Sequence, residues 1–284
     1  MLLGVDIGGT FTDFVLSDAT GQIRIHKRLT TPEDPSRGLL AGVAELDLPS
    51  SETLDVVHGS TIATNALLER KGARTALITT QGFADVLEIG RQTRPDLYDL
   101  HPRKPHPLVP MQWRFEVTER VASDGTIITP LALDVLGHIV EHILADDIES
   151  VAVCLLFSFL HPAHEQRIRD AIRNHATNHG SRITPHVFPI PEAKRSGTRF
   201  PPFVSLSSEV LPEFREYERT SATVINAYVA PLMSRYLKRL ETGLGEPRSS
   251  VAERGGGRLR IMQSNGGVIS AATAAEQAAR TVLS

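Results

Sequence analysis

The residues with the clearest chemical meaning form the run DIGGTFTD, residues 6–13. Its two glycines permit a tight turn, and because they lack Cβ atoms they let an anion approach the backbone N–H groups. Its threonines add hydroxyl donors, and its first aspartate can hold the Mg²⁺ that accompanies a nucleoside triphosphate. A plain hairpin with glycine in its turn is the alternative. The aspartate before the glycines and the Thr-Phe-Thr-Asp after them favour phosphate binding.

Two later turns carry similar groups. A short strand is expected to end at His58, and Gly59-Ser60-Thr61 then form a turn before a helix that runs to Gly72. Hydroxyls and free N–H groups at a helix start can bind an anion, and helix capping by the same hydroxyls is an equal alternative. The second turn, QSNGG at residues 263–267, follows a strand expected over residues 258–262 and could also place N–H groups near an anion.

A polar loop, RQTRPDLYDL at residues 91–100, follows a short helix that is expected to stop at Gly90. Arg91 and Arg94 offer fork-like donors to a carboxylate or phosphate, and Tyr98 adds an aromatic surface. The loop can therefore recognise a polar, planar ligand. A solvated loop held by salt bridges is nearly as good an interpretation.

Composition excludes several classes of protein. The chain has 284 residues, a formal net charge of −3 and one cysteine. This charge gives no basic field, so nucleic acid and anionic membranes are not expected partners. Cys154 lies in an apolar run, where a buried side chain is expected rather than a nucleophile. No apolar run is long enough to span a membrane, and we expect a cytoplasmic protein.

The elements that position these groups can be read from residue patterns. Strands are predicted over residues 2–7, 11–17 and 23–29 as an antiparallel meander, followed by alternating strands and helices. The proline-dense stretch 184–202 is the best candidate for a domain junction. Further elements are expected as a strand at 151–159, a helix or pair of helices at 212–240 broken or kinked near Pro231, and a hairpin of 113–121 with 126–129.

A helix that ends at Leu144 contains HIVEH, residues 138–142, which fits the H-x-x-E-H pattern of one zinc-peptidase class. We reject this metal site because the apolar positions form the buried face and leave the His and Glu side chains in water. The predicted buried face consists of Val135, Leu136, Ile139, Val140, Ile143 and Leu144.

The meander, helix and alternating strands suggest an α/β fold, with a ribonuclease-H-like N-terminal lobe of the kind found in actin, Hsp70 and sugar kinases. This lobe has a mixed sheet and flanking helices, and an incomplete second lobe follows it. The motifs DIGGTFTD, HGSTIATNALLERKGARTALITTQGFADVLEIGRQTRPDLYDL, SFLHPAHEQRI, SLSSEVLPEFREYERTSATVINAYVAPLM and MQSNGG resemble the N-terminal part of the hydantoinase A/oxoprolinase family. The expected domains are residues 1–183 and 203–284.

This resemblance implies ATP-dependent chemistry on a cyclic amide, such as hydantoin or 5-oxoproline ring opening, or ketone carboxylation in related subunits. ATP and Mg²⁺ are the implied cofactors, and a hydantoinase B-type subunit is an implied partner. The resemblance implies catalytic roles for Asp6, which would also bind the metal, and for Asp13. The implied phosphate-binding residues are Gly8, Gly9, Thr10, Thr12, Asn265, Gly266 and Gly267. The implied substrate-binding residues are His58, Ser60, Thr61, Asn65, Arg91, Arg94 and Tyr98.

Full-length members of this family continue beyond the matching segment into a second DxGGTxTD-like loop. We therefore expect a fragment, or a subunit that another polypeptide completes, which binds ATP weakly and does not by itself turn over hydantoins or oxoproline. A non-catalytic remnant that binds a partner subunit is one alternative. A sugar-kinase-like phosphotransferase, which shares DIGGT but not the GRQTRPDLYDL loop, is another.

Overall fold

In the computed structural model, the chain forms two compact units. Unit 1 joins Met1–Gly72 to Val229–Ser284, and unit 2 is Ala73–Tyr228. The structure describes residues 1–31, 33–48, 54–93, 98, 101, 105–179, 201–245 and 258–282. The predicted linear division at residues 183 and 203 does not coincide with these units and stays a prediction, and most of the proposed junction at 184–202 lies outside the described residues.

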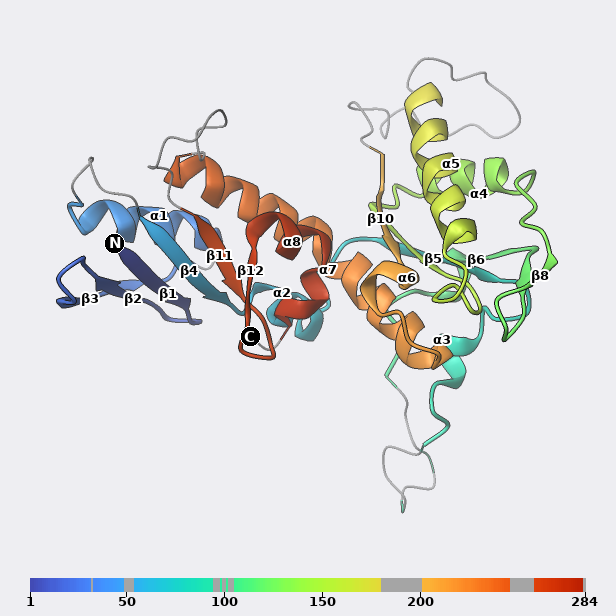
Figure 1. Ribbon diagram of the computed structural model, residues 1–284, viewed down its shortest axis with the longest axis horizontal. Coiled ribbons are helices and arrows are strands. Elements are labelled where there is room, and N and C mark those ends of the chain that lie inside the picture. Colours follow the sequence, from blue (N-terminus) through green and yellow to red (C-terminus); the bar gives the residue numbers. More distant parts are fainter. Residues whose placement is uncertain are drawn as a thin grey trace. The chain divides into compact units, whose positions relative to one another are not determined.

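Unit 1 is built on a mixed six-stranded sheet of order β12-β11-β4-β1-β2-β3 (Figure 1). β1, β2 and β3 pair antiparallel, whereas β1, β4 and β11 run parallel, and β12 returns antiparallel to β11. The prediction of three consecutive strands and a mixed sheet is confirmed. The strands are β1 (Leu2–Ile7), β2 (Phe11–Ser17), β3 (Ile23–Leu29), β4 (Asp55–Ser60), β11 (Leu259–Met262) and β12 (Val268–Ser270).

Side-chain alternation explains which face of this sheet is covered. In β1 and β2 every second residue is buried, and these buried residues are largely apolar, as expected when one face meets a core. Helix α1 (Pro35–Glu45) packs on this face so closely that a Cβ at Gly42 would lie 2.2 Å from Phe14 Cζ. The remaining helices of unit 1 are α2 (Ile62–Leu68), α8 (Ala271–Glu276), the 3₁₀ helix η3 (Ala278–Thr281) and the second part of α7 (Glu216–Leu244).

Unit 2 is built on a four-stranded sheet of order β10-β9-β5-β6, in which all neighbours are parallel. One core cluster joins this sheet to α4 and α5, and another joins it to the first part of α7. Burial on both faces accounts for the apolar character of its strands. The elements are β5 (Thr75–Thr80), α3 (Val86–Ile89), η1 (Met111–Trp113), β6 (Arg114–Val117), β7 (Arg120–Val121), β8 (Ile127–Thr129), α4 (Leu136–Ala145), β9 (Ser150–Cys154), α5 (Ala163–His179), β10 (Phe203–Leu206) and α6 (Ser207–Val210).

Several predicted boundaries are wrong. The strand expected over 151–159 ends at Cys154, because the chain turns there and Phe157 adopts a positive φ of 52°. Helix α2 ends at Leu68, two residues before Arg70, whose φ is 56°. Helix α7 begins at Glu216, four residues after the expected start, although it is the single long helix that one of the two alternatives predicted, with Pro231 inside it. The strand expected over 113–121 is two strands, and its second half forms the predicted hairpin with β8.

Within the described residues, no helix is both long and apolar enough to cross a membrane.

Candidate functional site

The carboxyl ends of three parallel strands meet at one edge of the unit 1 sheet (Figure 1). Ile7 at the end of β1 pairs with Ser60 at the end of β4, and β11 follows on the other side of β4. Three turns therefore leave the sheet at this edge: β1 to β2, β4 to α2, and β11 to β12. Ligands of open α/β sheets characteristically bind at this end of the strands.

The glycine turn between β1 and β2 is fixed at its base and open at its tip. Gly8 N–H donates to Phe11 O at 2.9 Å, and Thr30 Oγ1 donates to Gly8 O at 2.8 Å. Gly9 and Thr10 are exposed, and a Cβ at Gly9 would have no heavy atom within 4 Å. In the described part of the chain, the N–H groups of Gly9 and Thr10 make no backbone hydrogen bond. The tip can therefore donate to an anion.

Asp6 and Asp13 lie directly opposite one another on β1 and β2. Cross-strand neighbours point to the same face, so two carboxylates share one stretch of the sheet surface. Lys27 Nζ pairs with Asp13 Oδ1 at 3.0 Å, whereas Asp6 has no ion pair among the described residues. Like charges in this arrangement are destabilising unless a cation offsets them. The open carboxylate of Asp6 thus fits the predicted metal contact.

Thr12 differs from Thr10 in its placement. Its side chain is on the covered face and fully buried, where its hydroxyl hydrogen-bonds Thr30 Oγ1 at 3.0 Å. Because Thr30 in turn holds Gly8 O, the two threonines brace the glycine turn from inside. The structure therefore places the Thr12 hydroxyl where it supports the turn and away from solvent.

The turn after β4 is held by its own hydroxyls. Ser60 is buried, and its Oγ accepts from the N–H of Ile62, the first residue of α2, at 3.3 Å, whereas Thr61 at the N-cap makes no side-chain cap hydrogen bond. The capping interpretation therefore fits Ser60 and does not fit Thr61. Thr61 Oγ1 donates to Ile7 O at 3.4 Å and accepts from Asn65 Nδ2 at 3.4 Å. Thr61 and Asn65 lie next to the glycine turn through this contact with β1, and both are less buried than Ser60.

His58 lies inside unit 1. Its ring is fully buried, with Nδ1 3.3 Å from Val5 O and Nε2 2.7 Å from the Tyr236 hydroxyl. Burial lowers the pKa of His58 to about 4, so the ring is neutral at neutral pH. With both nitrogens engaged, this histidine positions β4 and α7, and it offers no exposed atom to a substrate.

The turn after β11 consumes most of its own donors. Gly266 N–H donates to Gln263 O at 2.9 Å, and Gly267 N–H donates to Asn265 Oδ1 at 3.0 Å. These two N–H groups, which were predicted to bind phosphate, are therefore satisfied within the turn. Asn265, Gly266 and Gly267 are exposed at the same edge as the glycine turn, and their predicted role stays a prediction.

The residues predicted to contact substrate through the polar loop belong to unit 2. Arg91 Nε donates to Glu218 Oε1 at 2.7 Å. This is the kind of salt bridge expected if the segment is a solvated loop held by salt bridges. Tyr98 is 93% exposed. Arg94 lies outside the described residues.

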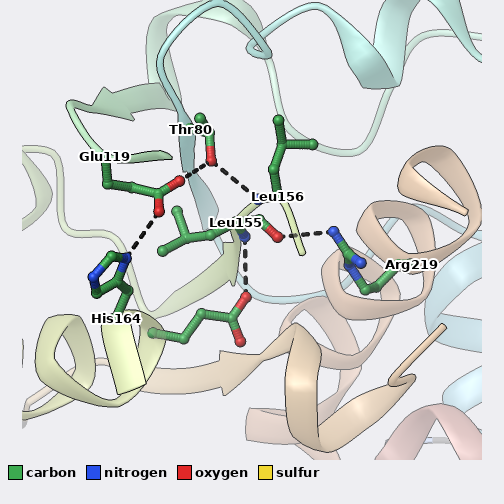
Figure 2. Close-up of polar contacts among 7 residues, drawn as sticks. Thr80, Glu119, Leu155, Leu156, His164 and Arg219 are labelled. Atoms are coloured by element: carbon green, nitrogen blue, oxygen red, sulfur yellow. Dashed lines mark hydrogen bonds and ion pairs between the residues drawn. The ribbon is translucent and has the colours of Figure 1, made fainter. Parts of the chain in front are cut away.

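A buried polar network closes the corresponding edge of the unit 2 sheet, and sequence reasoning missed it (Figure 2). Leu156 N–H donates to Thr80 Oγ1 at 3.0 Å, Thr80 donates to Glu119, and His164 Nδ1 lies 2.9 Å from Glu119 Oε2. Arg219 Nη2 donates to Leu155 O at 2.8 Å. All four side chains of this network are buried.

Glu165 forms the second half of this network. Its carboxylate accepts from Leu155 N–H at 3.0 Å, Ser207 Oγ at 2.6 Å and Ser208 N–H at 3.0 Å. The motifs SFLHPAHEQRI and SLSSEVLPEFREYERT supply His164, Glu165, both serines and Arg219. The signal was thus present in the resemblance, and the structure shows that these motif residues hold the chain after β9.

Two other sequence features have no site chemistry here. His138 and Glu141 are exposed and 3.5 Å apart, so the prediction that the H-x-x-E-H side chains face water is confirmed. The prediction that Val135 belongs to the buried face is wrong, because this residue is 38% exposed. Cys154 is buried as predicted, and burial raises the pKa of its thiol.

Comparison with known proteins identifies what this arrangement is similar to. Residues 2–176 match the hydantoinase/oxoprolinase N-terminal region, and residues 219–284 match hydantoinase/oxoprolinase. The chain is 38% identical over 281 residues to an uncharacterized protein of Methanocaldococcus jannaschii, covering 98% of this chain and 37% of that protein. It is 32% identical over 295 residues to caprolactamase subunit alpha of Pseudomonas jessenii, covering 99% and 38%.

A solved structure is similar to the chain over its whole length. The nucleotide-free structure of acetone carboxylase, an ATP-dependent enzyme, aligns with 100% of this chain and 38% of its own at a TM-score of 0.80 and 27% identity. The chain thus spans well under half the length of the relatives that it matches.

Proposed function

The chain belongs to the hydantoinase/oxoprolinase family, and from that premise we propose that it supplies a phosphate-binding and metal-binding part of an ATP-dependent enzyme that opens a cyclic amide. The proposal rests on the open edge of the unit 1 sheet. Its relatives include caprolactamase subunit alpha of Pseudomonas jessenii, and its fold is similar to the solved structure of the ATP-dependent caprolactamase of that organism.

The single observation that carries the proposal is the pair of opposed carboxylates beside an open glycine turn. Asp6 and Asp13 face each other, and only Asp13 has a lysine partner among the described residues. This leaves local negative charge next to a turn tip whose N–H groups favour an anion. A divalent cation between carboxylate and phosphate satisfies both features.

The residues present fit Mg²⁺ and the phosphates of ATP. Asp6 would contact the metal, directly or through water, because Mg²⁺ usually takes one or two carboxylates and keeps several waters. The backbone of Gly9 and Thr10 would donate to phosphate oxygens, since no side chain fills the space at Gly9. When bound, ATP supplies a phosphoryl group that turns the amide oxygen of an unreactive ring into a leaving group.

The chain's own residues act by positioning and charge. Phosphoryl transfer asks a protein mainly for alignment and charge neutralisation, and little covalent work. Thr12 and Thr30 hold the turn rigid from inside, and Thr61 ties the start of α2 to the end of β1. Lys27 offsets the charge of Asp13, which leaves Asp6 as the carboxylate available to a cation.

A second candidate is a subunit that activates a ketone for carboxylation. The likeness to acetone carboxylase, with a TM-score of 0.80, favours it. Both chemistries begin at a carbonyl oxygen, so the unit 1 site serves either. Two further points remain predictions: a partner subunit of the hydantoinase B type and a cytoplasmic location. The alternatives, a partner-binding remnant or a sugar-kinase-like phosphotransferase, also remain predictions.

Calorimetric titration of the chain with Mg·ATP tests the proposal. We expect measurable, weak binding that Asp6→Asn weakens about tenfold, because the substitution removes one charge-assisted contact. Asp55→Asn is the matched control, since Asp55 lies on the same sheet at the opposite, amino end of β4. Equal affinities of the wild type and Asp6→Asn would contradict the proposal.

A phosphate-release assay on the same protein tests the expected lack of turnover. Sustained release by the chain alone, stimulated by a hydantoin, 5-oxoproline or a lactam, would show that it needs no further polypeptide.

A further inference from the structure

Unit 2 contains a cavity of about 710 Å³ beside the first turns of α7. Its walls are α3 with the residues that follow it, the stretch 105–108, and residues 217–225. The ring of Tyr217, which also lines the cavity, lies beside Gly90, where an added Cβ would be 3.6 Å from it. Small-molecule sites are typically about 300–1,000 Å³ and mostly apolar with a few polar groups. Leu87, Leu108 and Val224 supply apolar lining here.

The Arg91–Glu218 pair supplies polar groups to the same cavity. Arg91 Nε donates to Glu218 Oε1 at 2.7 Å. Over the described ranges, the two terminal nitrogens of Arg91 have no hydrogen-bond partner, and besides Arg91 the Glu218 carboxylate receives a hydrogen bond only from its own backbone N–H. The hydrogen bond from Arg91 lowers the pKa of Glu218, which therefore stays ionised at neutral pH. The pair thus offers donors and an acceptor side by side.

A cyclic amide carries the complementary pattern. A small ring forces its amide to be cis, so that the carbonyl oxygen and the N–H lie on one edge. A linear secondary amide is trans and places the same two groups on opposite edges. An adjacent guanidinium donor and carboxylate acceptor therefore match the ring edge and not the linear amide.

We propose that this cavity binds the cyclic amide, with Arg91 donating to the carbonyl oxygen and Glu218 accepting from the ring N–H. This inference rests on the proposed function and names the recognition chemistry of its substrate. Leu87, Leu108 and Val224 contact the ring methylenes.

The test is an NMR titration of the whole chain, without nucleotide, with δ-valerolactam as the probe and leucine and valine methyl groups as reporters. We expect saturable shifts at Leu87, Leu108 and Val224. N-methyl-δ-valerolactam, which lacks the N–H donor, should bind at least about tenfold more weakly. Equal binding of the N-methyl compound, or no saturable shift at these methyl groups, would overturn the proposal.

Two variants assign the contacts. Arg91→Lys and Glu218→Gln should each weaken δ-valerolactam binding about tenfold. Glu209→Gln is the matched control, because it breaks the exposed Arg169–Glu209 pair of 2.7 Å elsewhere in unit 2 and should leave binding unchanged. Unchanged binding in both site variants would also overturn the proposal. Because the side chain of Arg91 is 62% exposed, its substitution should leave unit 2 folded. The fluorescence of the single tryptophan, Trp113, checks that each variant is folded.

A parallel Mg·ATP titration separates this inference from the proposed function. Loss of lactam binding with Asp6-dependent ATP binding intact refutes the cavity assignment alone. Lactam binding that depends on Glu218 in a chain that does not bind ATP refutes the phosphate site alone.

Discussion

Each unit places polar residues at the carboxyl ends of its parallel strands, but the two edges differ in exposure. In unit 1, Asp6, Gly9 and Thr10 are exposed, and the turn tip has unused donors within the described residues. In unit 2, Glu119, Glu165 and Arg219 are at most 3% exposed and bind backbone or side chains of their own unit. One edge can receive a ligand, whereas the protein's own side chains fill the other.

The difference shows that polar residues at a strand end serve binding or folding according to whether their hydrogen bonds are already made. A buried carboxylate with several donors stabilises the fold, and removing it leaves those donors unsatisfied. An exposed carboxylate with none contributes little to stability and is available to a cation. Substitutions at the two edges should therefore separate stability from binding.

The largest effect is expected at Glu165. In the native protein, N–H and O–H donors surround both carboxylate oxygens of Glu165. In Glu165→Gln, the amide nitrogen replaces one of these oxygens and faces donors that it cannot accept from. We expect unit 2 to lose about 4 kcal/mol of unfolding free energy. Urea unfolding followed by Trp113 fluorescence measures this change, because Trp113 belongs to unit 2. Glu209→Gln, at an exposed pair, should cost at most about 1 kcal/mol. Equal costs would erase the contrast between the edges.

The next effect is the acid sensitivity of unit 1. The pKa of His58 is lowered from 6.5 to about 4 by burial, so the unfolded chain binds the proton more tightly than the folded one. Stability is therefore full above pH 6.5 and falls as the pH decreases toward 4, by about 3 kcal/mol in total.

Hydrogen exchange of the β1 and β4 amides, corrected for intrinsic rates, measures this loss between pH 7 and pH 4. The His58→Gln variant should show a smaller pH dependence in the same amides. An identical pH dependence in the variant would assign the effect to other groups.

The smallest effect on stability is expected at Gly9. A Cβ there meets no heavy atom within 4 Å, and its φ lies outside the left-handed region. Gly9→Ala should change the unfolding free energy by no more than about 0.5 kcal/mol. It should weaken Mg·ATP binding about fivefold, because the methyl group obstructs access of phosphate to the turn N–H groups. Calorimetry and thermal unfolding of the same sample measure both quantities, and unchanged affinity would place the phosphate elsewhere.

Local patterns were sufficient for the elements that make hydrogen bonds with near neighbours. The strands at 2–7, 11–17 and 23–29 follow from alternation and turn residues, and the structure has the same bounds. Patterns failed where a distant contact ends an element. The run after Cys154 looks like a continuing strand, but its backbone is taken by Glu165, Thr80 and Arg219 from other elements.

The sequence by itself determined the family, the mixed sheet and the glycine turn with its flanking aspartates, because these depend on residue types at fixed short spacings. Only the tertiary structure decided which of the candidate polar groups are available. Thr12 and Thr10 are two residues apart in one motif, yet one braces the turn and the other is exposed. Side-chain direction in a strand alternates, and burial then depends on what packs against each face. Here that packing comes from α1, which lies outside the motif and contacts β1 and β2.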